Sequence, residues 1–238
     1  MSGAGVAGAV HTVAAENLWL IYPASKPVAR LLLCHGAGAP VQSDFLTQLA
    51  KSIALLGIEV WSRNFAYMQK TLLGHKQPPP KMPVLQQELQ HWLAELPTDL
   101  PIVLAGKSMG GRVATLLLSE NQSQAPQVAG MVVYGYPFRP PAKKMLPLSD
   151  LALVSRIGHL PKLAVPTLIL QGQRDAFGGP ELVTAEHVAT WPQIQLQWFA
   201  GGDHDYLTLK KNPCTQLDLI EQAAQATREF IDAKILAS

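Results

Sequence analysis

Residues 102–118 read IVLAGKSMGGRVATLLL. The first four are an apolar run typical of a buried strand, and the largely apolar residues after Gly111 are typical of a helix. Between them stands Ser108, with Gly106 two residues before it and Gly110 two residues after it. Small residues at these positions let a strand and a helix converge on a sharp turn, which lifts the serine hydroxyl clear of the sheet at a helix N-terminus. The stretch therefore predicts a strand–turn–helix unit with a serine at its apex.

The same alternation of strand and helix extends in both directions along the chain. Besides the strand at 101–105, others are expected at residues 18–22, 30–35, 58–63, 128–136, 167–170 and 194–199. Helices are expected between them, from a cap at Ser43 to a stop at Gly57, over 85–96, around 113–118 and over 217–235. This order predicts an α/β fold, a doubly wound and mostly parallel sheet of about seven strands with helices on both faces. The last strand alternates apolar and polar residues, which favours an edge position.

No change in composition and no repeat divides the chain, so we expect one domain over residues 1–238, with residues 1–16 loosely ordered. Two connections are long, residues 64–83 and 139–166, and both contain several prolines. Long connections in compact domains are often functional rims or lids, and a surface connection without a role is the alternative.

Composition excludes several classes of function. A formal net charge of +2 is too small to indicate a nucleic-acid binder, and 48% apolar residues with 15% charged residues exclude a disordered chain. The sequence contains no apolar run long enough to span a bilayer, and its first residues lack the basic and leucine-rich pattern of a secretory signal. Two cysteines are too few to stabilise a domain of this size by disulfide bonds, which favours a reducing compartment. We therefore expect a soluble, cytoplasmic protein; its oligomeric state is not predicted.

Ser108 needs a base if it is a nucleophile, and the base needs an orienting carboxylate. Three histidines follow Ser108, and His204 is the one that stands just past the last predicted strand, at the sheet edge where the serine is expected. Asp175 follows the strand at 167–170 at the same edge, whereas Asp203 adjoins His204 and its side chain would point away from it. The predicted catalytic residues are therefore Ser108, Asp175 and His204.

An acyl transfer also needs donors for a tetrahedral oxyanion. The N–H of Met109, directly after the nucleophile, is one candidate, and the loop after the strand at 30–35 supplies the other. There we favour Ala37, with Gly38 second, and expect His35 to tie the loop together by hydrogen bonds. Candidates for the walls of the substrate pocket are the residues Gly38, Tyr67, Met68, Tyr136 and Phe138.

Four motifs together resemble the α/β-hydrolase superfamily. They are HGAG at 35–38, GKSMGG at 106–111, GQRD at 172–175 and GGDH at 201–204. The similarity extends from about Leu18 to the C-terminus, and it is greatest to the small, nearly capless branch of dienelactone-hydrolase-like and testis-expressed-hydrolase-like proteins. The resemblance implies a serine hydrolase of carboxylic esters or thioesters without metal or other cofactor, with a small-molecule acyl substrate and an open, shallow site. Dienelactone hydrolases have Cys at the position of Ser108, so their substrate is not implied.

Other functions fit the sequence less well. A phosphate-binding P-loop would need Gly where Pro101 stands, and a dinucleotide fingerprint after the strand at 30–35 would need Gly at Val41. A metal site at residues 203–205 lacks an accompanying cluster of His or Cys. The main alternative is a protein with this fold that does not catalyse a reaction and serves as a binding or scaffold domain.

Overall fold

The computed structural model describes residues 11–12, 18–121, 123, 125–140 and 150–237. Within this part of the chain, eight strands form one sheet in the order β1-β2-β4-β3-β5-β6-β7-β8. They are β1 (His11–Thr12), β2 (Leu20–Tyr22), β3 (Ala29–Cys34), β4 (Ile58–Ser62), β5 (Ile102–Lys107), β6 (Val128–Tyr134), β7 (Thr167–Gly172) and β8 (Ile194–Phe199). Strands β3 to β8 run parallel to one another, whereas β2 pairs antiparallel with β4, and β1 antiparallel with β2. The predicted fold class is confirmed, with the two-residue β1 added at one edge.

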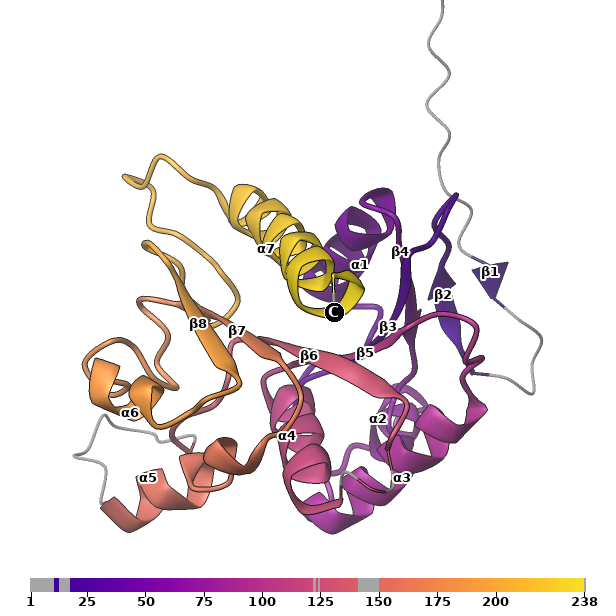
Figure 1. The fold of residues 1–238 in the computed structure, drawn as a ribbon, viewed down its shortest axis with the longest axis horizontal. Helices are drawn as coiled ribbons and strands as arrows, with labels where there is room; N and C mark the ends of the chain where they lie inside the picture. The colour runs from indigo at the N-terminus through magenta and orange to yellow at the C-terminus, as the bar shows by residue number, and fades with distance from the viewer. Residues whose placement is uncertain (1–10, 13–17, 122, 124, 141–149, 238) are drawn as a thin grey trace, which may run out of the picture.

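Helices cover both faces of the sheet (Figure 1). They are α1 (Asp44–Leu55), α2 (Ala66–Leu72), α3 (Met82–Glu95), α4 (Met109–Asn121), α5 (Asp150–Ile157), α6 (Ala185–Ala189) and α7 (Gln216–Ile231), with a short 3₁₀-helix η2 (Leu160–Lys162) and a π-helical turn η3 (Asp232–Leu236). α1 and α7 pack side by side on one face, and α2, α3 and α4 lie on the other. Strands β3, β5 and β7 are buried along their whole length because helices cover both of their faces. β8 is an edge strand and keeps the predicted alternation.

Some local details differ from the sequence predictions. The connection 64–83 contains α2, and the connection 139–166 contains α5 and η2. α2 is only seven residues long with two of them buried, which is too short for a helical period to be recognised. Ser43 stands at the N-cap of α1, but its side chain makes no capping hydrogen bond. Leu217 is 46% exposed, because the buried face of α7 is made by other residues, such as Leu219 and Ile220.

Two expectations fall on residues that the structure does not describe, namely most of the segment 1–16 and part of the connection 139–166. In the described part of the chain, no helix is both long enough and apolar enough to pass through a bilayer.

Parallel pairing brings the carboxyl ends of the central strands to one edge. Cys34 of β3 pairs with Gly106 of β5, and Lys107 pairs with Tyr134 of β6. The register continues to β7 and β8, where Gly172 pairs with Phe199. The loops that follow these strands are therefore neighbours, although they are far apart in the sequence.

Candidate active site

Ser108 lies at the turn between β5 and α4 in a strained backbone conformation. Its φ is +52°, a left-handed value that residues other than glycine rarely adopt, and among the described non-glycine residues only Tyr206 also has a positive φ. The N–H of Ser108 donates to the carbonyl oxygen of Tyr134 at 3.1 Å, which ties the turn to the end of β6. Such strain persists where surrounding contacts impose it, and it is concentrated at functional sites.

The glycines on either side of the serine permit two close approaches. A Cβ on Gly106 would lie 2.3 Å from the backbone nitrogen of Gly111, so this glycine lets β5 contact α4 directly. A Cβ on Gly110 would lie 2.6 Å from the carbonyl oxygen of His35. Gly110 therefore allows the start of α4 to contact the end of the neighbouring strand β3 and the loop after it. The local pattern of strand, turn and helix did not indicate this contact.

The loop after β3 lies beside the serine. A Cβ on Gly36 would be 3.5 Å from the Cβ of Ser108, an ordinary van der Waals contact. The next residue, Ala37, is exposed, and its carbonyl oxygen accepts a hydrogen bond from the hydroxyl of Tyr67 at 2.9 Å. Met109 is the first residue of α4, so its N–H is one of those without an acceptor inside the helix. The amides of Ala37 and Met109 thus belong to two segments that flank Ser108.

His35 holds this loop in place, as its position in the sequence indicated. Its Nδ1 lies 2.6 Å from the carbonyl oxygen of Gly36, and its Nε2 accepts the N–H of Phe65 at 3.0 Å. Since one ring nitrogen donates and the other accepts, these bonds require the neutral ring. Burial lowers the pKa of His35 to about 4, which keeps the ring neutral near pH 7.

Asp175 and His204 form a hydrogen-bonded pair at the same edge of the sheet. Nδ1 of His204 lies 2.8 Å from Oδ2 of Asp175. The other carboxylate oxygen, Oδ1, accepts the N–H of Phe177 at 2.7 Å, and Asp175 is only 3% exposed. The ring of Phe177 packs against the imidazole, with centroids 4.4 Å apart. Because Nδ1 is engaged by Asp175, Nε2 is the nitrogen left to exchange a proton with a reacting group.

The end of β6 connects the histidine to the serine. Gly135 directly follows Tyr134, whose carbonyl oxygen holds the amide of Ser108. A Cβ on Gly135 would lie 3.2 Å from Nδ1 of His204, so the imidazole rests on this glycine. Ser108 and His204 therefore both contact the end of β6, and the three predicted catalytic residues lie at one edge of the sheet.

Gln171 is a site residue that was not predicted from the sequence. It is fully buried, and its Nε2 donates to Oδ2 of Asp175 at 2.8 Å, the oxygen that His204 also contacts. Its Oε1 accepts the N–H of Tyr136 at 2.6 Å. The sequence did offer one signal for Gln171, because it is a polar residue at the end of an otherwise apolar strand, four residues before the predicted acid.

The structure revises the candidate walls of the pocket. Tyr136 and Phe138 are 0% exposed and belong to the core, so neither side chain lines an open site, and their assignment as pocket walls is corrected. Aromatic residues after a strand end pointed to a pocket wall, but packing against α5 and Trp191 buries them. Tyr67 and Met68 are also buried, although Tyr67 reaches the loop at Ala37 through its hydroxyl. Gly38 is exposed, with open space where a Cβ would be.

The other two histidines after Ser108 have structural contacts. Nε2 of His159 lies 2.8 Å from Oγ1 of Thr115, and burial lowers the pKa of His159 to about 4. His187 belongs to the capping box of α6 with Thr184.

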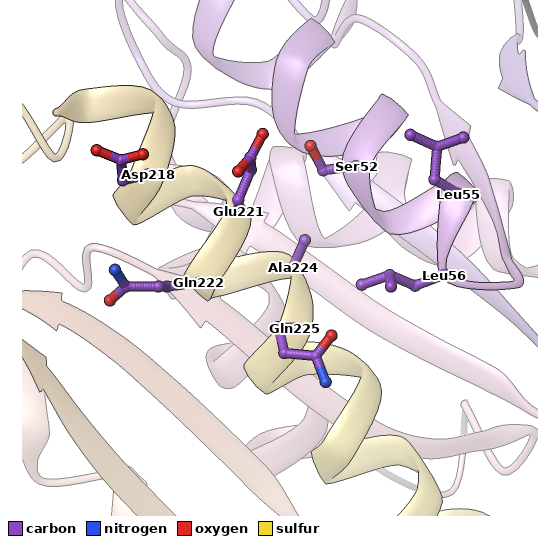
Figure 2. A pocket seen from close by; sticks show the side chains of 8 residues that line it. All are labelled: Ser52, Leu55, Leu56, Asp218, Glu221, Gln222, Ala224 and Gln225. Carbon is purple, nitrogen blue, oxygen red and sulfur yellow. The ribbon is translucent and has the colours of Figure 1, made fainter. Parts of the chain in front are cut away.

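An open surface pocket of about 500 Å³ lies away from this edge, between α1 and α7 (Figure 2). It is lined by Ser52, Leu55, Leu56, Asp218, Glu221, Gln222, Ala224 and Gln225. These lining residues include no histidine, so Ser52 has no imidazole there to take its proton. Among the described residues, no group of three or more His, Cys, Asp or Glu side chains is placed to hold a metal ion.

Comparison with known proteins identifies the class. Residues 27–232 match the family described as alpha/beta hydrolase domain, and the chain therefore belongs to this family. A comparison with curated proteins gave no match.

Several solved structures share the fold. A dienelactone hydrolase from Anabaena variabilis is 18% identical with a TM-score of 0.65, and the alignment covers 91% of each chain. Est1E from Butyrivibrio proteoclasticus with bound ferulic acid is 13% identical with a TM-score of 0.66, covering 92% of this chain and 95% of that one. YbtT, a type II thioesterase of a yersiniabactin pathway, is 18% identical with a TM-score of 0.62, covering 93% of this chain and 99% of that one. At these identities the likeness establishes the fold.

Proposed function

We propose that this protein is a serine hydrolase that cleaves a carboxylic ester or thioester through an acyl-enzyme intermediate. The observation that carries the proposal is a strained serine at a strand–helix turn, together with a 2.8 Å hydrogen bond from a buried Asp175 to His204 at the same edge of the sheet. The similar structures include proteins described as a dienelactone hydrolase, an esterase with ferulic acid bound and a thioesterase, which supports acyl transfer as the reaction type.

In the first step, Nε2 of His204 takes the hydroxyl proton of Ser108 as Oγ attacks the substrate carbonyl carbon. The carbonyl electron pair moves to the oxygen, and the amides of Met109 and Ala37 stabilise this oxyanion. Asp175 fixes the imidazole tautomer and stabilises the imidazolium that forms. The oxyanion then collapses, the bond to the leaving oxygen or sulfur breaks, and His204 returns the proton to the leaving group.

The second half of the reaction regenerates the enzyme. His204 takes a proton from water, the resulting hydroxide attacks the acyl carbon, and the same two amides stabilise the new oxyanion. Its collapse releases the carboxylic acid, and Ser108 recovers its proton from the imidazolium. Every proton passes through His204, and the sequence of steps uses only side chains and backbone amides of this chain, without a metal or other cofactor.

A cytoplasmic location is part of the proposal. Cys34, the last residue of β3, and Cys214 are free thiols, and Cys34 is buried, which supports a reducing compartment.

A fluorophosphonate probe tests the nucleophile. We expect the wild-type protein to be labelled and to hydrolyse p-nitrophenyl butyrate, and Ser108→Ala to lose labelling and at least about 10⁴-fold of kcat. Labelling that persists in Ser108→Ala would place the nucleophile elsewhere. If wild-type turnover is unchanged by His204→Ala, the protein is a binding or scaffold domain with this fold. A panel of oxygen esters and thioesters of increasing acyl length then distinguishes the substrate classes.

A further inference from the structure

Lys107, the residue directly before the serine, is buried. Its side chain is only 7% exposed, although lysine is among the side chains least often buried without a partner. The ammonium lies 5.5 Å from the centroid of the Phe45 ring, at the start of α1. A serine turn alone does not require a buried cation at this place.

The partner of Lys107 comes from the histidine loop, residues 201–207. Nζ of Lys107 lies 3.1 Å from Oδ1 of Asp205, the residue directly after His204. The side chain of Asp205 is 57% exposed, so the bridge extends from the buried end of β5 to a loop at the surface. The pair therefore joins the residue before the predicted nucleophile to the residue after the predicted base.

Other contacts hold the histidine loop to itself and to β7. Oδ1 of Asp203 accepts the N–H groups of Asp205 and Leu207, each at 2.9 Å. Tyr206 has a φ of +62°, and its buried hydroxyl donates to the carbonyl oxygen of Leu170 at 2.9 Å. These bonds fix the shape of the loop and its distance from β7, but they do not reach β5, where Ser108 follows.

We infer that the Lys107–Asp205 ion pair positions His204 over Ser108, a role that rests on the proposed function. A displacement of about 1 Å between reacting groups can cost on the order of 10²-fold in rate. The contacts of the imidazole with Asp175, Phe177 and Gly135 remain when the pair is lost. The direct link from the histidine loop to β5 does not remain, so we expect the imidazole to shift relative to the serine without being released. Lys107 and Asp205 act through His204 and do not themselves contact the reacting atoms.

Removing Lys107 and removing Asp205 leave different charged groups without a partner. Burial lowers the pKa of Lys107, and the carboxylates of Asp205, Asp175 and Asp203 act in the opposite direction. Lys107→Met leaves a half-exposed carboxylate that water can solvate. Asp205→Asn leaves a buried ammonium without this partner, which is the more destabilising case. Because both changes remove the same bridge, we expect similar losses of rate with different losses of thermal stability.

The experiment measures the kinetics of Lys107→Met, Asp205→Asn and the double variant on p-nitrophenyl butyrate. We expect kcat to fall about 10- to 100-fold in each single variant, with KM within about threefold of wild type. The kcat of the double variant should be no lower than that of the slower single variant, because each single substitution already removes the same ion pair. Asp205→Glu keeps the carboxylate and should retain most of kcat. Arg228→Met, which removes an ion pair with Asp232 and a hydrogen bond to the carbonyl oxygen of Leu56, is the matched control and should keep the wild-type kcat.

Two outcomes would overturn the inference while the proposed function stands. One is a folded Lys107→Met or Asp205→Asn protein with kcat within about twofold of wild type. The other is a double variant whose fold-loss of kcat equals the product of the losses in the two single variants. If Lys107→Met does not fold, the comparison of Asp205→Asn with Asp205→Glu decides, because equal rates in these two exclude a role of the charge. The absence of fluorophosphonate labelling in wild type instead contradicts the proposed function itself.

Discussion

The two halves of the candidate site are built in different ways. The nucleophile half, residues 34–38 and 106–111, is held by backbone segments that approach closely where glycines leave out a Cβ. The acid–base half, residues 171–178 and 201–207, also contains a close approach, since a Cβ on Gly172 would lie 2.3 Å from the carbonyl oxygen of Asp203. It is held in addition by side chains, among them Gln171 and Asp175 of this half and Lys107 of β5. Close backbone contacts tolerate no added atom, whereas a side-chain network can lose one member and keep the fold, with a loss of rate. The two halves should therefore respond differently to substitution.

The largest effect is expected in the nucleophile half, from Gly106→Ala. The added Cβ would lie 2.3 Å from the backbone nitrogen of Gly111, so β5 and α4 must separate. We expect the free energy of unfolding to fall by about 3 kcal/mol or more, with hydrolysis lost. Urea unfolding measures the change. Gly38→Ala is the matched control, since a Cβ there meets nothing within 4 Å. Similar unfolding midpoints for the two variants would show that the close approach does not hold the turn.

A smaller effect is expected in the acid–base half, from Gln171→Leu. The substitution keeps the approximate volume but leaves Oδ2 of Asp175 and the N–H of Tyr136 short of a partner. We expect a loss of about 2 kcal/mol in the free energy of unfolding and of about tenfold in kcat, with the fold retained. Denaturant unfolding and steady-state kinetics measure both. Gln197→Leu, on the exposed side of β8, is the control and should leave kcat unchanged. A fully active Gln171→Leu would remove this residue from the site.

The smallest effect is a pH dependence of stability that comes from the buried histidines. The pKa of His35 is about 4 in the folded protein against an ordinary value of 6.5, so the unfolded chain binds more protons between these values. Stability contributed by its neutral ring is therefore present above pH 6.5 and is lost as the pH falls toward 4. Between pH 7 and 5.5 we expect a loss of about 1 kcal/mol from His35, with His159 adding in the same direction. Urea unfolding at both pH values measures the loss, and His35→Asn should reduce it. A His35 ring that titrates between pH 6 and 7 by NMR would contradict the prediction.

Much of the fold could be predicted because its signals are local. Apolar runs indicated the central strands, and the alternation in residues 194–199 indicated an edge strand. The spacing of Gly106, Ser108 and Gly110 indicated the turn, and the serine there has a positive φ. The short helix α2 was missed because seven residues with two buried side chains do not make a recognisable period.

The site was predictable only in part. The order of residues after the strand ends selected Asp175 and His204, and the structure brings their side chains to 2.8 Å from each other. Gln171 and Lys107 were not selected. A polar residue at the end of an apolar strand is a local signal, but it does not indicate which partner the side chain finds across a loop. Tyr136 was assigned to a pocket wall because an aromatic residue after a strand can face either a ligand or the core.

The sequence by itself determined seven of the strands, where the strained turn falls and which residue types follow the strand ends, because these depend on neighbours a few positions apart. Only the tertiary structure decided which polar side chains pair beneath the surface and which aromatic rings are covered. Those outcomes depend on distances between segments far apart in the chain, and such distances exist only once the strands have taken their order in the sheet.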